Sequence, residues 1–366
     1  MPSFDSLGLP TNDTTINPLG NILESGAGPL TDTTVHTRMT SGTVTCGTND
    51  SSRVSVDNVN VTCTAFNCKG FKSNAHFISS LLESSDIVCL SETWLRPSES
   101  NIIYDTLSRL DHSHKISFSK SSMNDIDPCY SGRPFGGVAI ICKNMENLSF
   151  YELNTNSDRI VAVAACDING AIVQVFVSVY FPFYDGGQTQ TDLFIATLDA
   201  LQSLIDEHAM IAPIRIMGDF NAQLPHEFKL CRLWYKKRGF NSHSSILYDF
   251  IASNRLSAVD LSFKQQVNYT YFSFANNHFS WIDHVLSTNN DTDNIVTCEI
   301  LPLCQDNLSD HLPLKLIVSV PVNNSSHDVV KTLSSLRFNP PGNWSNHSKN
   351  LMYKKLWKII LKIFLC

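Results

Sequence analysis

A short apolar stretch that ends in polar residues, at 213–222, constrains this sequence more than any other feature. The run Ile-Arg-Ile-Met at 214–217 is typical of a buried strand, and Gly218 is predicted to end that strand. Asp219 and Asn221 lie two residues apart, so an extended backbone would place both side chains on one face. A carboxylate can orient or deprotonate water, and an amide can donate to an oxygen that gains charge. A polar turn would use the same residues, so the interpretation depends on the other strand ends.

Other predicted strands end in polar residues of the same kind. The segment 58–67 alternates like a strand, and 86–92 is a buried apolar run. Between them, 72–83 has helical spacing with Ser73 as its expected cap, which predicts a crossover unit with parallel strands. A polar residue ends each of these two strands, Asn67 the first and Glu92 the second, and Tyr180 ends a third strand predicted further along the chain.

The middle of the chain is expected to form consecutive antiparallel strands. Residues 97–134 are polar and are interpreted as loop. Strands are predicted at 136–142, 159–165 and 171–180, with Asn169-Gly170 as a tight turn between the last two. An amphipathic helix then spans 191–208 and leads into the Asp219 strand.

The last third of the domain is expected to hold a helix, a hairpin and two further strands. The helix is predicted at 244–254, one strand at 258–263 and the other at 312–320. Segments 269–274 and 280–286 are interpreted as the two arms of a hairpin with 275–278 at its tip.

Composition limits the partners that this chain can attract and the cellular compartment in which it is expected. A net charge of −7 excludes a global basic field that attracts nucleic acid, so any such contact needs local basic residues or bound cations. The 11 dispersed cysteines fit a reducing compartment. The start has no basic, apolar signal pattern, so we expect a nuclear or cytoplasmic protein that is not secreted.

Three regions follow from the change of composition along the chain. Residues 1–57 are rich in Ser, Thr and Asn without periodic apolar residues, and they are predicted to be disordered. Residues 58–322 form the expected domain, and 323–366 a linker and a basic, apolar tail. The tail could lie on a membrane surface, but no apolar run reaches the length of a spanning helix, and we expect no stable membrane association.

The polar residues at the strand ends are of types that serve phosphate chemistry. They are Asn67, Glu92, Tyr180, Asp219, Asn221, Asp283, Asp310 and His311. Oxygen-rich sets of this kind favour Mg²⁺ or Mn²⁺, and the scarcity of nearby Cys and His argues against zinc. Taken singly, each carboxylate could be a surface group and His311 a structural histidine.

Five phrases in order resemble the endonuclease/exonuclease/phosphatase superfamily, and most of all the endonuclease domains of non-LTR (LINE-type) retrotransposons. The phrases are Phe66-Asn-Cys-Lys-Gly70, Leu90-Ser-Glu-Thr-Trp-Leu95, Gly218-Asp-Phe-Asn-Ala222, Ser280-Trp-Ile-Asp-His284 and Ser309-Asp-His311. The resemblance implies a four-layer α/β sandwich, with two mixed sheets face to face and helices outside.

The resemblance also implies roles for these residues. Glu92, Asn67 and Asp310 resemble metal ligands, and Tyr180 resembles a phenol near the phosphate. Asp219 resembles the residue that aligns or deprotonates water, with Asn221 as a donor to the phosphate. His311 resembles the imidazole that contacts the scissile phosphate, with Asp283 orienting it. Thr270 and Ser309 match positions that bond the DNA backbone, and Asn276, Asn277 and His278 are expected at a hairpin tip that reads DNA.

The function implied is Mg²⁺-dependent cleavage of one strand of double-stranded DNA, with a 3′-hydroxyl left at the nick. A reverse transcriptase module would be the partner in a full-length relative. Two alternatives stay open: a phosphomonoesterase or lipid phosphatase on the same fold, and a truncated non-catalytic relic. One departure concerns Tyr180, which is followed by Phe-Pro-Phe where repair-type relatives have Val-Pro-Asn, and this argues against abasic-site repair. The basic, aromatic stretch 229–238 fits either a DNA contact or a solvated face.

Overall fold

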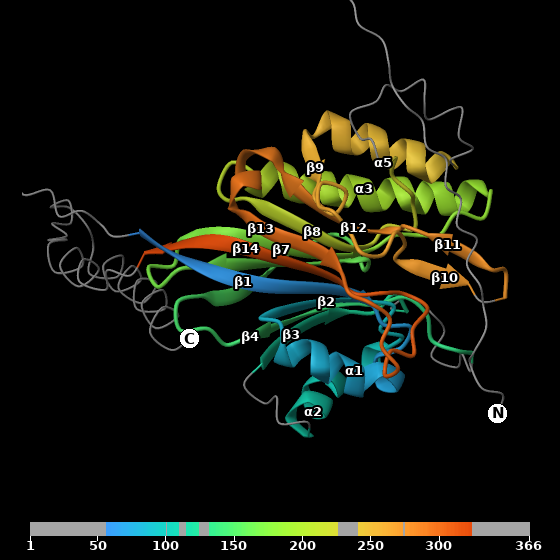
Figure 1. Cartoon of the computed structure of the whole chain (residues 1–366), viewed down its shortest axis with the longest axis horizontal. Coiled ribbons are helices and arrows are strands. Elements are labelled where there is room, and N and C mark those ends of the chain that lie inside the picture. The colour runs from blue at the N-terminus through green and yellow to red at the C-terminus, as the bar shows by residue number, and fades with distance from the viewer. Residues whose placement is uncertain are drawn as a thin grey trace, which may run out of the picture. The chain divides into compact units, whose positions relative to one another are not determined.

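Two six-stranded mixed sheets carry the fold, and a separate two-stranded hairpin projects beside them (Figure 1). The computed structural model describes residues 56–99, 101–109, 115–123, 132–225, 241–273 and 275–323. The first sheet has the order β13-β14-β1-β2-β4-β3, and the second β5-β6-β7-β8-β12-β9. The strands of the first sheet are β1 (Val56–Asn67), β2 (Ile87–Ser91), β3 (Lys115–Lys120), β4 (Val138–Lys143), β13 (Ile295–Ile300) and β14 (Leu314–Asn323). Those of the second are β5 (Ser149–Leu153), β6 (Ile160–Cys166), β7 (Ile172–Tyr180), β8 (Ile214–Asp219), β9 (Leu256–Ala258) and β12 (Asp283–Thr288).

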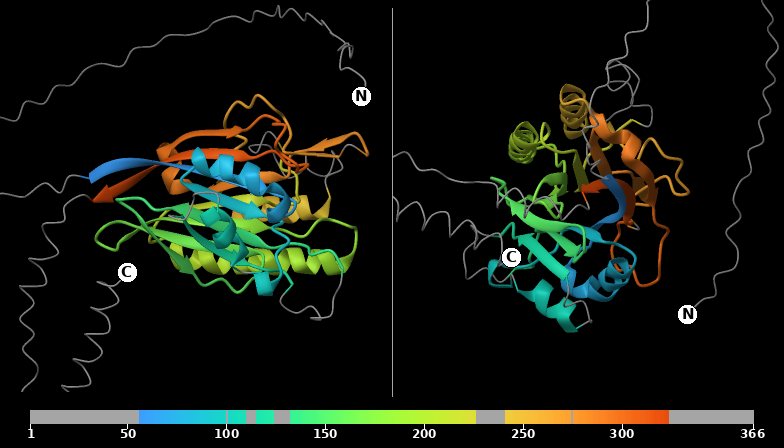
Figure 2. Two further views of the ribbon diagram at one scale, coloured as in Figure 1. Left: turned by 90° about the horizontal axis from the view of Figure 1, so that it is seen from below. Right: turned by 90° about the vertical axis from the view of Figure 1, so that its left-hand side faces the viewer.

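Helices cover the outer face of each sheet, so the described chain has four layers. They are α1 (Phe71–Glu83), α2 (Ile102–Arg109), α3 (Gln188–His208) and α5 (Ser242–Ser253). Figure 2 shows α1 and α2 on one side of the paired sheets and α3 and α5 on the opposite side. Three apolar clusters fill the spaces between the layers, and the largest lies between the two sheets. The expected four-layer α/β sandwich is confirmed.

Strand β2 illustrates why a continuous apolar run suits this position. All five of its residues are buried. Ile87 and Cys89 face the space between the sheets, whereas Val88 and Leu90 pack under α1. Because successive side chains leave opposite faces, a strand covered on both faces must be apolar at every position.

Two crossover connections bring strand ends together at one edge. Strand β1 runs parallel to β2 with α1 between them, as predicted. Strand β7 likewise runs parallel to β8, with α3 between them. The carboxyl ends of parallel neighbours lie at the same edge of a sheet, which is where polar residues were predicted.

Several sequence expectations were wrong in the first half of the domain. Residues 97–134 are not all loop, because they contain the 3₁₀ turn η1 (Pro97–Glu99), helix α2 and strand β3. Helix α2 buries only Ile103 and Leu107, too few apolar residues to reveal it. The strand predicted at 136–142 does not continue toward β6; it is β4, paired with β2 and β3 in the other sheet.

The start of α1 also differs from the expectation. The helix begins at Phe71 after Gly70, and Ser73 is not its cap, since its hydroxyl donates to the Gly70 carbonyl. Gly70 has φ 102°, and a Cβ there would lie 2.7 Å from the Trp94 ring. Glycine is therefore required at this helix start by both backbone conformation and space.

The elements in the second half of the domain differ less from the predicted ranges. The strand predicted at 258–263 is the shorter β9, which ends at Ala258, and the strands β5 and β13 were not predicted. The hairpin consists of β10 (Tyr271–Ser273) and β11 (His278–Ser280). Its second arm does not extend to residue 286, because β12 leaves the hairpin and pairs with β8.

Some predictions fall outside the described residues. These concern residues 1–55, the basic stretch at 229–238, Phe274 and the C-terminal tail. None of the helices in the described ranges combines the length and apolar character required to cross a membrane.

Candidate active site

Strand register brings the predicted polar residues together at one edge of the paired sheets. In the first sheet Asn67 lies beside Ser91, which Glu92 follows. In the second, Tyr180 lies beside Asp219, and Asp219 lies opposite Asp283 on the antiparallel strand β12. The site therefore draws on both sheets and not on one loop.

Hydrogen bonds connect these residues in pairs across the two sheets. Asn67 Nδ2 donates to Asp219 Oδ2 over 2.9 Å. The Tyr180 hydroxyl donates to Glu92 Oε1 over 3.0 Å. His311 Nδ1 lies 2.8 Å from Asp283 Oδ2. Both Asn67 and Asp219 are 1% exposed, so their bond spans the interior between the sheets.

Asp219 is a carboxylate held in an unfavourable electrostatic environment. Burial and the neighbouring Asp283 raise the pKa of Asp219 to about 7, although His311 acts in the opposite direction. Its oxygens accept from Asn67 and from the backbone N–H of Asn221 over 2.8 Å. A buried carboxyl that titrates near neutral pH has the property of a general base.

His311 is a cation at neutral pH. Burial by itself lowers the pKa of His311, but Asp283, to which it is hydrogen-bonded, and Asp219 outweigh burial and raise this pKa to about 9. Its Nδ1–H therefore donates to Asp283. Within the ranges that the structure describes, Nε2 has no protein hydrogen-bond partner, so the second N–H can donate to a ligand oxygen.

Tyr180 is a neutral phenol beside a carboxylate. Burial and the charge of Glu92 raise the pKa of Tyr180 well above its usual value. The Arg159 guanidinium lies 5.4 Å from the centre of the Tyr180 ring. The phenol therefore keeps its proton and acts as a hydrogen-bond donor.

The backbone around Asp219 differs from the predicted extended run. Gly218 does not end the strand, because β8 continues through it to Asp219. Its φ is 142°, and a Cβ would lie 2.2 Å from the Val179 carbonyl oxygen, so only glycine allows β7 and β8 to approach this closely. Asn221 has φ 48°, in the left-handed region. Its side chain still meets Asp219, with Nδ2 donating over 2.9 Å to the Phe181 carbonyl and over 3.3 Å to Asp219.

Thr270 and Ser309 are buried and hydrogen-bonded to site residues, and their predicted contact with the DNA backbone stays a prediction. Thr270 is fully buried, and its hydroxyl oxygen accepts from the backbone N–H groups of Ile282 and Asp283. The Ser309 hydroxyl donates to the Asn67 carbonyl over 2.7 Å and accepts from the His311 N–H. Both hydroxyl groups therefore hold site residues in place, and Ser309 also lines a pocket beside the site.

Asp310 lies beside His311 in sequence but has a different partner. Its carboxylate pairs with the ammonium of Lys69. The charged groups that shift the pKa values of Asp219 and His311 are Glu92, Asp283 and each other, and Asp310 is not among them. Asp310 therefore has a charged partner of its own, although it directly precedes His311.

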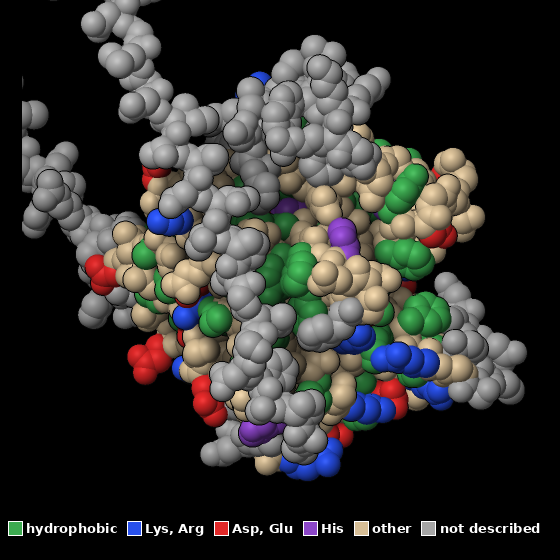
Figure 3. Space-filling model, turned by 45° about the vertical axis from the view of Figure 1, so that its right-hand side comes forward, with side chains coloured by type: hydrophobic (Ala, Val, Ile, Leu, Met, Phe, Trp, Pro, Cys, Tyr) green, Lys and Arg blue, Asp and Glu red, His purple; other side chains and the backbone are tan. Residues whose placement is uncertain are grey.

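Asn276, Asn277 and His278 lie at the exposed end of the β10–β11 hairpin, as expected. His278 is the first residue of β11, and the turn before it includes Asn277 at φ 46°. The hairpin lines two hollows. One, of about 640 Å³, includes Phe272, Lys69 and Asp310, and the other, of about 290 Å³, includes Tyr271, His278 and Asn221. Figure 3 shows this side of the molecule, where Lys and Arg side chains gather close to hydrophobic ones.

The residues present fit a hard divalent cation. Three carboxylates, those of Glu92, Asp219 and Asp283, act on one another through space, and one imidazolium opposes them. A bound cation would relieve this repulsion, and carboxylate oxygens are the ligands that Mg²⁺ prefers. Asp219 and Asp283 also present carboxylate oxygens within 4.8 Å of one another, and the His311 imidazolium, which donates and does not ligate, lies beside them.

Lys69 and Tyr271 belong to the site surroundings but were not singled out in the sequence. Lys69 is the one charged residue of the Phe66–Gly70 phrase, and this charge could have identified it as a candidate site residue. The Tyr271 ring lies 4.9 Å from that of His311, and the two residues form a β-bridge. Tyr271 carried no signal, because only the folded hairpin brings it to His311.

Comparisons with known proteins agree with this architecture. Residues 64–311 match the family described as "Endonuclease/Exonuclease/phosphatase family". No curated protein matches the sequence. Among solved structures, the chain is similar to an AP endonuclease from Archaeoglobus fulgidus, with 18% identity, a TM-score of 0.52, and coverage of 70% of this chain and 99% of that one.

Two other solved structures have a similar fold at lower identity. A 3′ phosphatase, NExo, from Neisseria, bound to product DNA hairpin, is 14% identical with a TM-score of 0.50, covering 70% of this chain and 98% of that one. The endonuclease domain of TRAS1, a telomere-specific non-LTR retrotransposon, is 13% identical with a TM-score of 0.48, covering 71% and 98%. At these sequence identities the likeness concerns the fold alone.

Proposed function

The chain belongs to the endonuclease/exonuclease/phosphatase family, and from that premise we propose that it is a divalent-metal-dependent endonuclease that nicks double-stranded DNA and leaves a 3′-hydroxyl. The observation that carries this proposal is the connected set of three hydrogen-bonded pairs: Asn67–Asp219, Tyr180–Glu92 and Asp283–His311. Together they supply a base, a neutral donor, a cationic donor and, in Glu92, a carboxylate of which Tyr180 occupies one oxygen. Hydrolysis of a phosphodiester needs each of these functions.

Asp219 is proposed to orient and deprotonate the attacking water. Its raised pKa lets it accept a proton at neutral pH, and the bonds from Asn67 and the Asn221 N–H fix its orientation. The Asn221 amide has its longer bond, 3.3 Å, to Asp219. The N–H of Asn221 that makes this longer bond could donate to a phosphate oxygen instead.

His311 and Tyr180 are proposed to donate to the phosphate. The imidazolium of His311, oriented through Nδ1 by Asp283, offers its Nε2–H to an oxygen that gains negative charge. The protonated phenol of Tyr180 supplies a second, neutral donor. Charge that develops in the transition state thus meets donors that are already fixed in place.

Glu92, with the amide oxygen of Asn67, is proposed to hold Mg²⁺ or Mn²⁺. Tyr180 bonds to only one of the two Glu92 oxygens, and in the described ranges the other oxygen has no hydrogen-bond donor. A bound cation would supply charge neutralisation at the phosphate. Asp310, the third predicted ligand, is paired with Lys69.

The choice of DNA as substrate is supported by the five retrotransposon-like phrases and by the exposed hairpin beside the site. In this proposal the protein works in the nucleus or cytoplasm. A reverse transcriptase module would use the 3′-hydroxyl at the nick as a primer end.

The decisive experiment compares supercoiled plasmid with phosphomonoesters as substrates of the full chain. We expect Mg²⁺-dependent relaxation of the plasmid, loss of activity in EDTA, and nicks that a DNA polymerase extends without prior phosphatase treatment. Glu92→Gln should lower the activity, with partial recovery at high Mn²⁺. Release of phosphate from inositol phosphates without nicking would show a phosphatase instead, and undiminished nicking in EDTA would exclude metal dependence.

The hairpin tip is proposed to select the nicked sites. Asn276 and His278 are exposed and can donate to and accept from base edges. The tip residues 275–278 contain no Arg or Lys, so replacing Asn276–His278 with Gly and Ser should change the positions of mapped nicks while leaving the salt dependence of binding nearly unchanged. Identical nick maps would show that local DNA shape, and not the hairpin, selects the site.

A further inference from the structure

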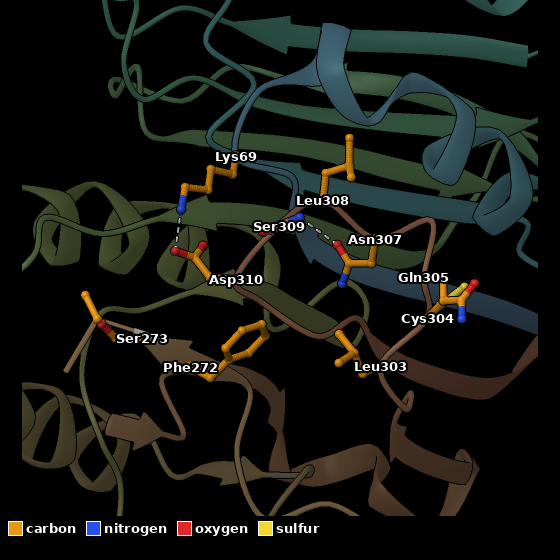
Figure 4. A pocket seen from close by; sticks show the side chains of 11 residues that line it. Lys69, Phe272, Ser273, Leu303, Cys304, Gln305, Asn307, Leu308, Ser309 and Asp310 are labelled. Carbon is orange, nitrogen blue, oxygen red and sulfur yellow. Dashed lines mark hydrogen bonds and ion pairs between the residues drawn. The ribbon is translucent and has the colours of Figure 1, made fainter. Parts of the chain in front are cut away.

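An ion pair lies beside the active site at a place where the sequence predicted a metal ligand. The ammonium of Lys69 contacts Asp310 Oδ2, and Figure 4 shows the two side chains meeting across a pocket. Their side chains are 38% and 23% exposed, so a ligand in solution can reach both. This pair therefore differs from the buried pairs of the catalytic cluster.

The backbone holds both partners in place. Ser309 Oγ donates to the Asn67 carbonyl, which ties the segment before Asp310 to the segment before Lys69. Lys69 has φ 45°, an uncommon conformation for a residue with a side chain, and its N–H donates over 3.1 Å to Asn67 Oδ1. The Asp310 carbonyl accepts from the Phe272 N–H. The contact between Lys69 and Asp310 is thus fixed from both sides by site residues.

The pocket next to this pair has the composition of a nucleotide site. It has a volume of about 640 Å³, and its lining includes Phe272, Leu303 and Leu308 besides the ion pair. Leu303 and Leu308 are 56% and 66% exposed, which leaves apolar surface open to a sugar or base. An ammonium group in a pocket with apolar side chains suits a phosphate attached to a sugar or base.

We propose that Lys69 binds a phosphate of the DNA strand next to the cleaved bond, and that Asp310 positions Lys69 and is not a metal ligand. The inference rests on the proposed function. An ammonium has three donors, and Asp310 takes one of them, so two remain for phosphate oxygens. Asp310 immediately precedes His311, which places this phosphate close to the one that His311 contacts.

The salt dependence of DNA binding tests the role of Lys69 apart from cleavage. In EDTA, where the full chain does not cut, the affinity for a short duplex is measured over a range of salt concentrations. Losing one phosphate contact should reduce the slope of log K against log salt by about 0.9. We expect this reduction in Lys69→Gln, and the slope of the wild type in Lys69→Arg. An unchanged slope in Lys69→Gln would overturn the proposal, even if the protein nicks DNA.

Metal affinity tests the role of Asp310. The affinity for Mn²⁺, measured by calorimetry without DNA, should fall by about tenfold or more in Glu92→Gln, because the cation loses a charged ligand. In Asp310→Asn it should stay within about twofold of the wild-type value. A loss in Asp310→Asn as large as that in Glu92→Gln would make Asp310 a metal ligand and overturn the assignment.

Discussion

Two buried histidine–aspartate pairs lie close together in this fold and share one geometry, but they differ in what the second nitrogen of each imidazole contacts. His311 Nδ1 lies 2.8 Å from Asp283 Oδ2, and His284 Nδ1 lies 2.9 Å from Asp260 Oδ2. Asp283 and His284 are consecutive in sequence, so their side chains leave opposite faces of β12. One pair faces the edge of the sheets and the other faces the interior.

The difference lies in the second nitrogen of each imidazole. His284 Nε2 lies 3.0 Å from the Ala222 carbonyl oxygen, which can only accept a hydrogen bond. Burial lowers the pKa of His284, but Asp260 outweighs burial and raises it, so both ring nitrogens donate within the protein. Asp260 is also satisfied, since it accepts from Trp281 Nε1 and the Val285 N–H. A fully bonded ion pair of this kind is structural, whereas His311 keeps one donor for a ligand.

The largest expected effect is the loss of nicking in His311→Ala. The cationic donor acts mainly on the transition state, so nicking should fall at least ~100-fold. The unfolding free energy should fall as well, because Asp283 is only 3% exposed and loses its partner, but by less than in the fully buried pair of His284 and Asp260. The measurements are the rate of plasmid nicking and the thermal midpoint of the purified variant. A folded His311→Ala protein that nicks at a near-normal rate would contradict the role of this pair.

The matched substitution in the other pair, His284→Ala, should have the reverse effect. It leaves a buried charge on Asp260 without its partner, which costs ~3–5 kcal/mol of unfolding free energy. The fraction that remains folded should nick at a rate close to that of the wild type. Chemical denaturation gives the first quantity, and the rate per folded molecule at low temperature gives the second. If His284→Ala unfolds like the wild type, the two pairs do not differ in the way their contacts indicate.

The sequence contained enough information to predict where the strand ends meet. Asn67, Glu92 and Asp219 follow buried strands, and parallel crossover connections must bring such ends to one edge. Periodicity could not show which carboxylate faces which neighbour. The pairing of Asp310 with Lys69 joins residues 241 positions apart and depends on the conformation of two loops.

The distinction between the two histidines was also beyond the sequence. His284 and His311 both follow an aspartate directly, so the local pattern is the same. Each histidine bonds to an aspartate other than that neighbour, His284 to Asp260 and His311 to Asp283, and only His284 has a second partner in the Ala222 carbonyl among the described residues. The buried hydroxyl of Thr270 likewise has no local signal, since its partners lie on the far side of the hairpin.

The subtlest expected effect concerns the pH at which the enzyme works. Asp283 raises the pKa values of both Asp219 and His311. Activity should therefore rise with pH as Asp219 loses its proton near 7, and fall as His311 loses its proton near 9. In Asp283→Asn the charge is gone, and both limbs of the kcat/KM profile should move to lower pH, the upper one by about one unit or more.

The sign of the matching stability effect follows from the same shift. The pKa of His311 in the fold lies above the ~6.5 of a free imidazole, so its pairing with Asp283 contributes fully below pH ~6.5 and is lost as the pH rises through about 9. Asp283→Asn should flatten this part of the stability curve. Asp199→Asn makes an equal charge change on the exposed face of α3. It should move neither limb of the kcat/KM profile and should leave the dependence of stability on pH unchanged. NMR titration of the His311 ring gives a readout that does not depend on activity. If its pKa stays near 9 in Asp283→Asn, then Asp283 does not set the charge of His311, and this pair is no more than a structural counterpart of His284 and Asp260.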